Sequence, residues 1–132
     1  MGERHSFVQF ASMNNEDLVH LYLDDMRRCP KGFALARTGE ECIMLLRECK
    51  VDILSLDYEL GFESKMCGRD VVMAIILEKL YPREVYLHTS SMFGKREMYQ
   101  LLYEHKPADM ILHNGPMSDE TLHRIAKAVD QA

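Results

Sequence analysis

Acidic residues stand at the ends of two apolar runs in this chain. Asp24 and Asp25 follow the run Val19–Leu23, and Asp57 follows the run Val51–Leu56. If these runs are neighbouring parallel strands, their carboxyl ends meet at one edge of a sheet and the three carboxylates converge. Carboxylates held so close repel one another unless a cation joins them, and their hard oxygens suit Mg²⁺. The pattern favours a magnesium site at Asp24, Asp25 and Asp57; the alternative is that Asp24 and Asp25 are ordinary turn residues.

Polar residues also follow a third apolar run, Val85–Leu87, in the order His88, Thr89, Ser90. A histidine has an unperturbed pKa near neutrality, so His88 is the candidate acid–base group, with His113 after the last apolar run as second choice. The competing interpretation is that His88 is a structural histidine with its ring satisfied inside the protein. Thr89 and Ser90 offer hydroxyls that suit a bound phosphate.

Basic residues gather in the loops that follow these runs: Arg27, Arg28, Lys31, Lys65, Arg69, Lys95 and Arg96. Local cations around an acidic pocket suit a phosphate that Mg²⁺ and Lys or Arg neutralise together. Arg27 and Lys95 are the candidate phosphate ligands. Lys95 follows Gly94 at an expected helix start, where backbone N–H groups add donors. The alternative for each residue is a solvated loop charge.

The elements that must position these residues alternate between strand and helix. Strands are predicted at Val19–Leu23, Phe33–Arg37, Val51–Leu56, Val85–Leu87 and Met110–Leu112. Between them, helical patterns follow a capping box that begins at Thr38, span Arg69 to Leu80, lie in a shorter stretch after Gly94, and follow Ser118. This alternation predicts an α/β fold, a doubly wound five-stranded parallel sheet with helices on both faces.

One crossover in this scheme is unusually short. Only the residues from Asp24 to Gly32 separate the first two strands, too few for a crossover helix. We expect a first helix that is shortened or missing. Residues 1–18 are interpreted as an N-terminal extension, and residues 19–132 as a single domain.

Composition limits the class of protein. The 132 residues are 47% hydrophobic and 28% charged, which fits one globular domain. A net charge of −5 argues against a broad nucleic-acid-binding surface. The longest apolar run, Val71 to Leu77, is too short to span a membrane. Four cysteines form no C-x-x-C pair, and no export signal is recognised, so reduced thiols and a cytoplasmic location are expected.

Several of these segments together resemble the two-component receiver fold: Leu23-Asp24-Asp25, Ser55-Leu56-Asp57 and Gly68-Arg69-Asp70-Val71-Val72. The chain is most similar to a divergent branch, the cyclic-phosphate-processing receiver-like domains, through Leu23-Asp24-Asp25-x-Arg27, Leu56-Asp57-x-x-Leu60-Gly61, and His88-Thr89-Ser90 with Gly94-Lys95-Arg96-Glu97-Met98. The resemblance implies strand order 2-1-3-4-5, Mg²⁺ held by the paired acids and Asp57, and a phosphoryl-accepting Asp57.

The departures from the receiver pattern set the functional alternatives. An ordinary receiver carries Lys-Pro after the fifth strand, where this chain has His113-Asn114-Gly115-Pro116. Losing that lysine argues against switching by phosphorylation and favours an Mg²⁺-dependent domain that hydrolyses cyclic phosphates of nucleotides or RNA ends, with His88 as acid–base. Two alternatives stay open: a stand-alone receiver phosphorylated at Asp57 that acts through a protein partner, and a degenerate receiver that only binds protein.

Overall fold

The structure is a computed structural model, and it describes residues 18–131. Its elements along the chain are β1 (Val19–Leu23), β2 (Ala34–Ala36), α2 (Gly39–Glu48), β3 (Val51–Leu56), α3 (Gly68–Glu78), β4 (Glu84–Leu87), α4 (Met92–His105), β5 (Ile111–Leu112) and α5 (Asp119–Gln131). The five strands form one sheet in the order β2-β1-β3-β4-β5, and every neighbouring pair is parallel. The predicted α/β fold and strand order are therefore confirmed.

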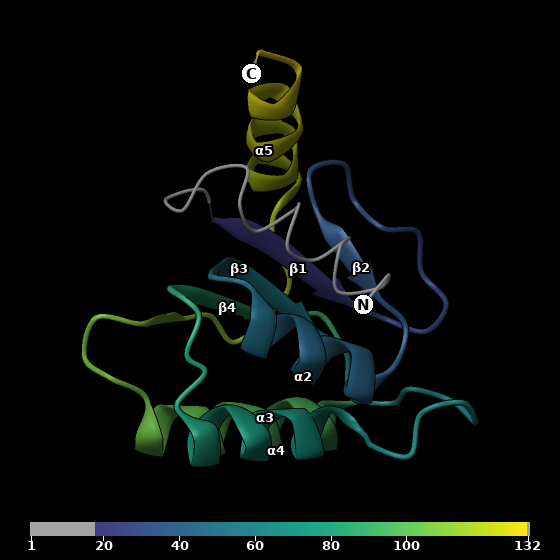
Figure 1. The fold of residues 1–132 in the computed structure, drawn as a ribbon, viewed down its shortest axis with the longest axis vertical. Coiled ribbons are helices and arrows are strands. Elements are labelled where there is room, and N and C mark those ends of the chain that lie inside the picture. The colour runs from purple at the N-terminus through teal and green to yellow at the C-terminus, as the bar shows by residue number, and fades with distance from the viewer. Residues whose placement is uncertain (1–17, 132) are drawn as a thin grey trace.

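Helices cover the two faces of this sheet unequally. Figure 1 shows α2, α3 and α4 under one face and, among the described helices, α5 on the other. The main core lies between the sheet and the three helices; its fully buried side chains include Leu21, Leu54, Val71 and Leu87. A smaller core on the α5 face holds Tyr22, Ile53, Tyr86, Met117 and Ile125.

No helix joins β1 to β2 in the described part of the chain. Residues 24–33 cross as a loop, as the short spacing predicts, so this connection adds no helix beside α5 in the part of the chain that the structure describes. The predicted extension, residues 1–18, lies outside the described residues except for Leu18. None of the described helices is long and apolar enough to cross a membrane.

Two helix boundaries differ from their predictions for local reasons. The helix expected after Gly94 begins earlier, at Met92, because the Ser91 side chain caps it by accepting the Gly94 N–H at 3.0 Å. It is also the longest described helix rather than a short one. The helix predicted to reach Leu80 ends at Glu78, because Lys79 adopts a left-handed conformation (φ 58°).

Two caps match the sequence pattern. The Thr38 hydroxyl accepts the Glu41 N–H at 3.1 Å at the start of α2, and the Ser118 hydroxyl accepts the Thr121 N–H at 3.1 Å before α5. Such caps satisfy N–H groups that a helix start leaves without partners. They fix where α2 and α5 begin, and hence where the loops that follow β2 and β5 end.

Candidate phosphate and metal site

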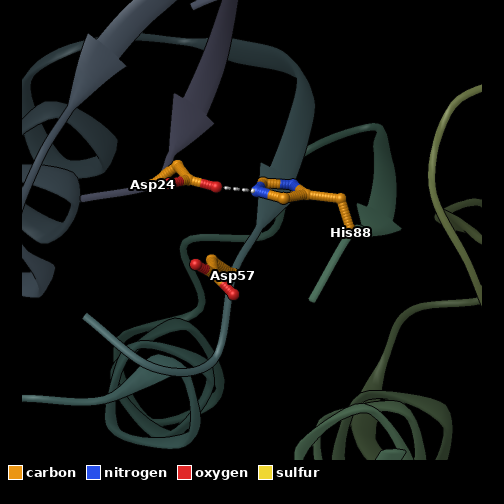
Figure 2. A group of neighbouring side chains, drawn as sticks. All are labelled: Asp24, Asp57 and His88. Atoms are coloured by element: carbon orange, nitrogen blue, oxygen red, sulfur yellow. Dashed lines mark hydrogen bonds and ion pairs between the residues drawn. The ribbon is translucent and has the colours of Figure 1, made fainter. Parts of the chain in front are cut away.

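Asp24, Asp57 and His88 come together at the carboxyl edge of the sheet. They follow β1, β3 and β4, three adjacent strands, and Figure 2 shows their side chains converging. One potential ligand atom from each residue lies within 4.8 Å of the others. The convergence expected of neighbouring parallel strands is therefore present for Asp24 and Asp57, and it includes His88 as well.

The His88 ring is held on both nitrogens. Its Nε2 lies 2.9 Å from Oδ2 of Asp24, and its Nδ1 lies 2.6 Å from the Ser55 hydroxyl. The Tyr22 ring stacks flat against it, with centroids 4.4 Å apart and an interplanar angle of 4°. With an ionised Asp24, Nε2 carries the proton of the neutral ring and Nδ1 accepts from Ser55. Burial lowers the pKa of His88 despite the opposing Asp24 charge, so the neutral ring is favoured.

Asp24 is the most enclosed of the three converging residues, with 1% of its surface exposed. Burial by itself would raise the pKa of Asp24. The backbone N–H groups of Arg27 and Met26, both 2.8 Å from Oδ1, and the bond from His88 outweigh burial and hold that pKa below its usual value. Asp24 is therefore a fixed negative charge at neutral pH.

Asp57 shows the opposite behaviour. Burial, with the nearby charge of Asp24, raises the pKa of its carboxyl above the usual value. The Tyr58 N–H, which donates to Oδ1 at 2.7 Å, and hydrogen bonding from Thr89 only partly offset this. An ionised Asp57 beside an ionised Asp24 is thus electrostatically unfavourable, which is the condition that a cation relieves.

Arg27 provides the cation nearest to these carboxylates. Its Nη1 donates to the His88 carbonyl at 2.8 Å and lies 3.4 Å from Oδ2 of Asp24. Arg37 holds the same loop in place, because its Nη1 donates to the carbonyls of Asp24 and Arg27 at 3.2 and 2.9 Å. The loop that replaces the first helix therefore carries a positioned guanidinium.

The other predicted residues are not part of this group of three. The Asp25 carboxylate packs against Gly61, where an added Cβ would stand 2.7 Å from Oδ2, and it is not part of the group of three. Ser90 is exposed. Lys95 lines a hollow on α4. His113 is turned away, because its Nε2 bonds to Glu84 at 2.7 Å and its ring stacks on Tyr86.

The start of α4 does not offer the free backbone N–H donors that the sequence suggested for Gly94 and Lys95. The Gly94 N–H donates to the Ser91 hydroxyl and the Lys95 N–H to the Ser91 carbonyl at 2.9 Å, so both donors are occupied. Gly94 instead makes room for an aromatic ring. A Cβ there would lie 2.2 Å from the ring of Tyr58, the residue after Asp57.

A family model described as "Cyclic-phosphate processing Receiver domain" matches residues 19–104, and this match spans all three residues of the centre. The chain belongs to this family. A search of curated proteins finds no match.

Two solved structures resemble this receiver domain in their backbone. One, titled as a fusion to a trimeric coiled coil of yeast Spc42, has a TM-score of 0.53 at 16% identity, covering 88% of this chain and 80% of its own. The other is the response regulator domain of Thermotoga maritima CheB, with a TM-score of 0.49 at 18% identity, covering 87% of this chain and 92% of its own. At such identity the first likeness concerns the fold alone.

The donor set of this receiver domain fits a hard divalent cation. Two carboxylates meet at the centre, and burial, with the charge of Asp24, raises the pKa of Asp57, so its ionised form is unfavourable without a cation. Asp57 has the freer carboxylate, because Asp24 already accepts from two backbone N–H groups and from His88. His88 is a poor ligand in this arrangement, since both ring nitrogens are bonded within the protein.

Sequence reasoning missed Tyr22, Ser55 and Tyr58. Tyr22 and Ser55 each precede a site aspartate by two residues, so strand alternation places them on the same face of the sheet. Ser55 is also the one hydroxyl in the run Val51–Leu56, which is a usable signal. Tyr58 has no such signal: its hydroxyl donates to Glu97 at 3.1 Å, a contact that depends on where α4 packs.

Proposed function

We propose that this domain is an Mg²⁺-dependent phosphate-handling enzyme that opens cyclic phosphates of nucleotides or RNA ends. The main support is that Asp57 faces a fixed Asp24–His88 pair and Arg27. Residues 111–118, which include β5 and the segment after it, contain no lysine to contact an aspartyl phosphate. The matched family carries cyclic-phosphate processing in its description.

The proposed reaction is hydrolysis at phosphorus. A water oxygen forms a bond to phosphorus, one of the two ester P–O bonds of the ring breaks, and the released oxygen takes up a proton, leaving a phosphomonoester. Asp57 accepts the proton from the attacking water, because its carboxylate makes fewer hydrogen bonds within the protein than that of Asp24. Thr89, Ser90, Arg27 and Lys95 are the proposed ligands of the phosphate oxygens.

Asp24, Asp25 and Asp57 would hold the metal ion. When bound, Mg²⁺ supplies positive charge that offsets the charge developing on the phosphate oxygens. Asp25 would need to move its carboxylate from Gly61 towards the centre. Asp24 would give up its 3.4 Å approach to Arg27, and the guanidinium would then be available to the phosphate.

His88 is proposed as a positioning residue that acts through Asp24. The alternative is the direct acid–base role expected from the sequence. It requires the ring to exchange the 2.9 Å bond to Asp24 for one to the substrate. The two roles differ in their consequences, because a glutamine at position 88 still donates to Asp24 but does not transfer a proton at neutral pH.

The test is turnover of a nucleoside 2′,3′-cyclic monophosphate with and without Mg²⁺, followed by chromatography. We expect Mg²⁺-dependent ring opening that Asp57→Asn lowers by about 100-fold or more, the usual size of a lost proton-transfer group. Asp52→Asn, the same change at the other end of β3, is the matched control and retains turnover. His88→Gln retains part of the activity if His88 only positions Asp24. Absence of turnover in the wild type, or full turnover in Asp57→Asn, contradicts the proposal.

A second candidate function is phosphorylation of Asp57 followed by binding of a protein partner. It is favoured by Thr89, whose side chain lowers the pKa of Asp57 and so is near enough to suit a hydroxyl that contacts a phosphoryl oxygen. In that reaction Asp57 forms an O–P bond and the phosphodonor's own P–O bond breaks, releasing acetate when acetyl phosphate is used. Intact mass after incubation with acetyl phosphate and Mg²⁺ distinguishes the two, because only the second candidate predicts one added phosphoryl group that Asp57→Asn abolishes.

A further inference from the structure

A hollow of about 420 Å³ lies on α4, and none of the carboxylates of the site lines it. We call it the α4 groove, and its lining on the helix consists of Met92, Lys95, Arg96, Tyr99, Gln100 and Tyr103. Asn114, from the segment after β5, contributes the remaining side chain. The groove therefore combines two cations, two phenol rings and two amides, and its lining contains no carboxylate.

The two tyrosines of the α4 groove form a stacked pair. Tyr99 and Tyr103 are one helical turn apart, and their ring centroids lie 5.9 Å apart at an interplanar angle of 15°. Tyr103 is 63% exposed, so much of this aromatic surface faces solvent. Exposed aromatic faces next to cations are the usual means by which proteins bind the bases of single-stranded nucleic acid.

The positive character of the α4 groove is local. The chain as a whole carries a net charge of −5. Of the two glutamates on α4, Glu97 is bonded to Arg69 and Tyr58, and Glu104 accepts from Gln100 at 3.3 Å without lining the groove. An anionic ligand would therefore meet Lys95 and Arg96 before it meets a carboxylate.

The α4 groove starts beside the candidate site. Its first residue, Met92, comes three residues after Thr89, whose side chain acts on the pKa of Asp57. Phe93, 68% exposed, packs edge-on against Tyr58 with centroids 6.4 Å apart. From Met92 to Tyr103 the helix rises about 16 Å. A chain with its end at Asp57 can thus continue over Phe93 and along the groove.

We infer that the α4 groove binds the single strand of an RNA whose cyclic-phosphate end enters the Asp57 site. This inference rests on the proposed function and selects the RNA end over a free cyclic nucleotide as its substrate. A protein partner is the alternative occupant, because Tyr, Met and Arg are also common in protein interfaces. The two cations, the absence of a carboxylate from the lining and the start of the groove beside the site favour RNA.

Binding of a fluorescein-labelled ten-nucleotide RNA with a 3′-hydroxyl end, measured by anisotropy on the full chain, tests the groove without requiring turnover. We expect Tyr103→Ala to weaken binding by about 5- to 100-fold, the usual effect of removing one stacking ring. Arg96→Ala should reduce the slope of log K against log salt by about 0.7, the effect of one lost phosphate contact to a single strand. Lys127→Ala removes an exposed cation on α5 and serves as the charge-matched control, with an unchanged slope.

The same variants are then assayed for turnover of a nucleoside cyclic monophosphate, which does not extend into the groove. The assignment of the α4 groove as an RNA site is supported if Tyr103→Ala and Arg96→Ala turn over the mononucleotide at the wild-type rate but bind RNA more weakly. If no cyclic phosphate is opened but both variants still lose RNA affinity, the proposed enzyme activity fails and the groove as an RNA site stands. If the wild type does not bind the RNA, or both variants bind it like the wild type, the groove is not an RNA site. A protein that binds wild type but not Tyr103→Ala would then be its occupant.

Discussion

Replacing Asp57 with asparagine should stabilise the protein at neutral pH. The change keeps the shape of the side chain and an oxygen that accepts the Tyr58 N–H, while it removes a charge facing Asp24. At the separation of at most 4.8 Å, two unit charges repel by about 1 kcal/mol in water and about 3–4 kcal/mol at the effective dielectric of a protein surface. The cations and N–H groups around Asp24 reduce this, so we expect a gain of about 1–2 kcal/mol.

The pH dependence of this gain follows from the direction of the Asp57 pKa shift. The folded carboxyl has a raised pKa, so the folded state binds its proton more tightly than the unfolded state does. Stability therefore falls as pH rises from the usual value of 3.8 through the raised pKa, and the full cost of the charge is present above it. The advantage of Asp57→Asn should be complete at pH 7 and vanish towards pH 3.8.

Urea unfolding of both proteins at several pH values measures this difference, and a thermal scan should show a rise in Tm of about 3–10 °C. Asp52→Asn is the control, because Asp52 lies 3.7 Å from Arg83 and 3.9 Å from His20, and removing its charge gives no gain. Saturating Mg²⁺ should narrow the difference in unfolding free energy, because the variant lacks one of the three carboxylates that would hold the ion and gains less from it. Two results would refute the electrostatic reasoning. One is that Asp57→Asn is no more stable than the wild type at pH 7, and the other is that its stability advantage at pH 4 is as large as at pH 7.

Three further predictions concern the surroundings of the site. Ser55→Ala leaves Nδ1 of His88 buried without its partner, and urea unfolding should show a loss of about 1–3 kcal/mol. Gly94→Ala forces the Tyr58 ring aside and should cost about 1–3 kcal/mol in the same assay, with the phenol near-ultraviolet dichroism altered. Because the pKa of His88 is lowered in the folded state, wild-type stability should fall as pH drops below 6.5, and His88→Gln should weaken that dependence.

The fold was predictable because its signals are local. Each strand is a short apolar run, and caps such as Thr38 and Ser118 mark where helices begin. The convergence of Asp24 and Asp57 then follows from the parallel arrangement of adjacent strands, since parallel strands end at one edge. Neither inference needs any knowledge of side-chain packing.

The parts that were not predictable depend on packing. Nothing in the sequence indicates that both nitrogens of His88 are engaged, because Ser55 lies on a different strand 33 residues earlier. The role of Gly94 was also hidden, since its reason is a ring from another loop rather than a turn. His113 was the second-choice histidine, and only the register of β4 and β5 pairs it with Glu84 and Tyr86.

The loop that joins β1 to β2 in place of a crossover helix also supplies the positive charge of the site. The residues that would begin a crossover helix instead turn back at Asp24, whose Oδ1 accepts the N–H groups of Met26 and Arg27. That turn brings the Arg27 guanidinium to the His88 carbonyl and near Asp24. Arg37 holds the loop in place by donating to the Arg27 carbonyl. Residues 111–118 contain no lysine, so in the described structure the positive charge of the site comes from the first strand's loop instead of the fifth's. A guanidinium there is available to a ligand phosphate once Asp24 turns to a metal ion, which favours a site that binds a phosphate ligand over one in which Asp57 alone carries a phosphoryl group.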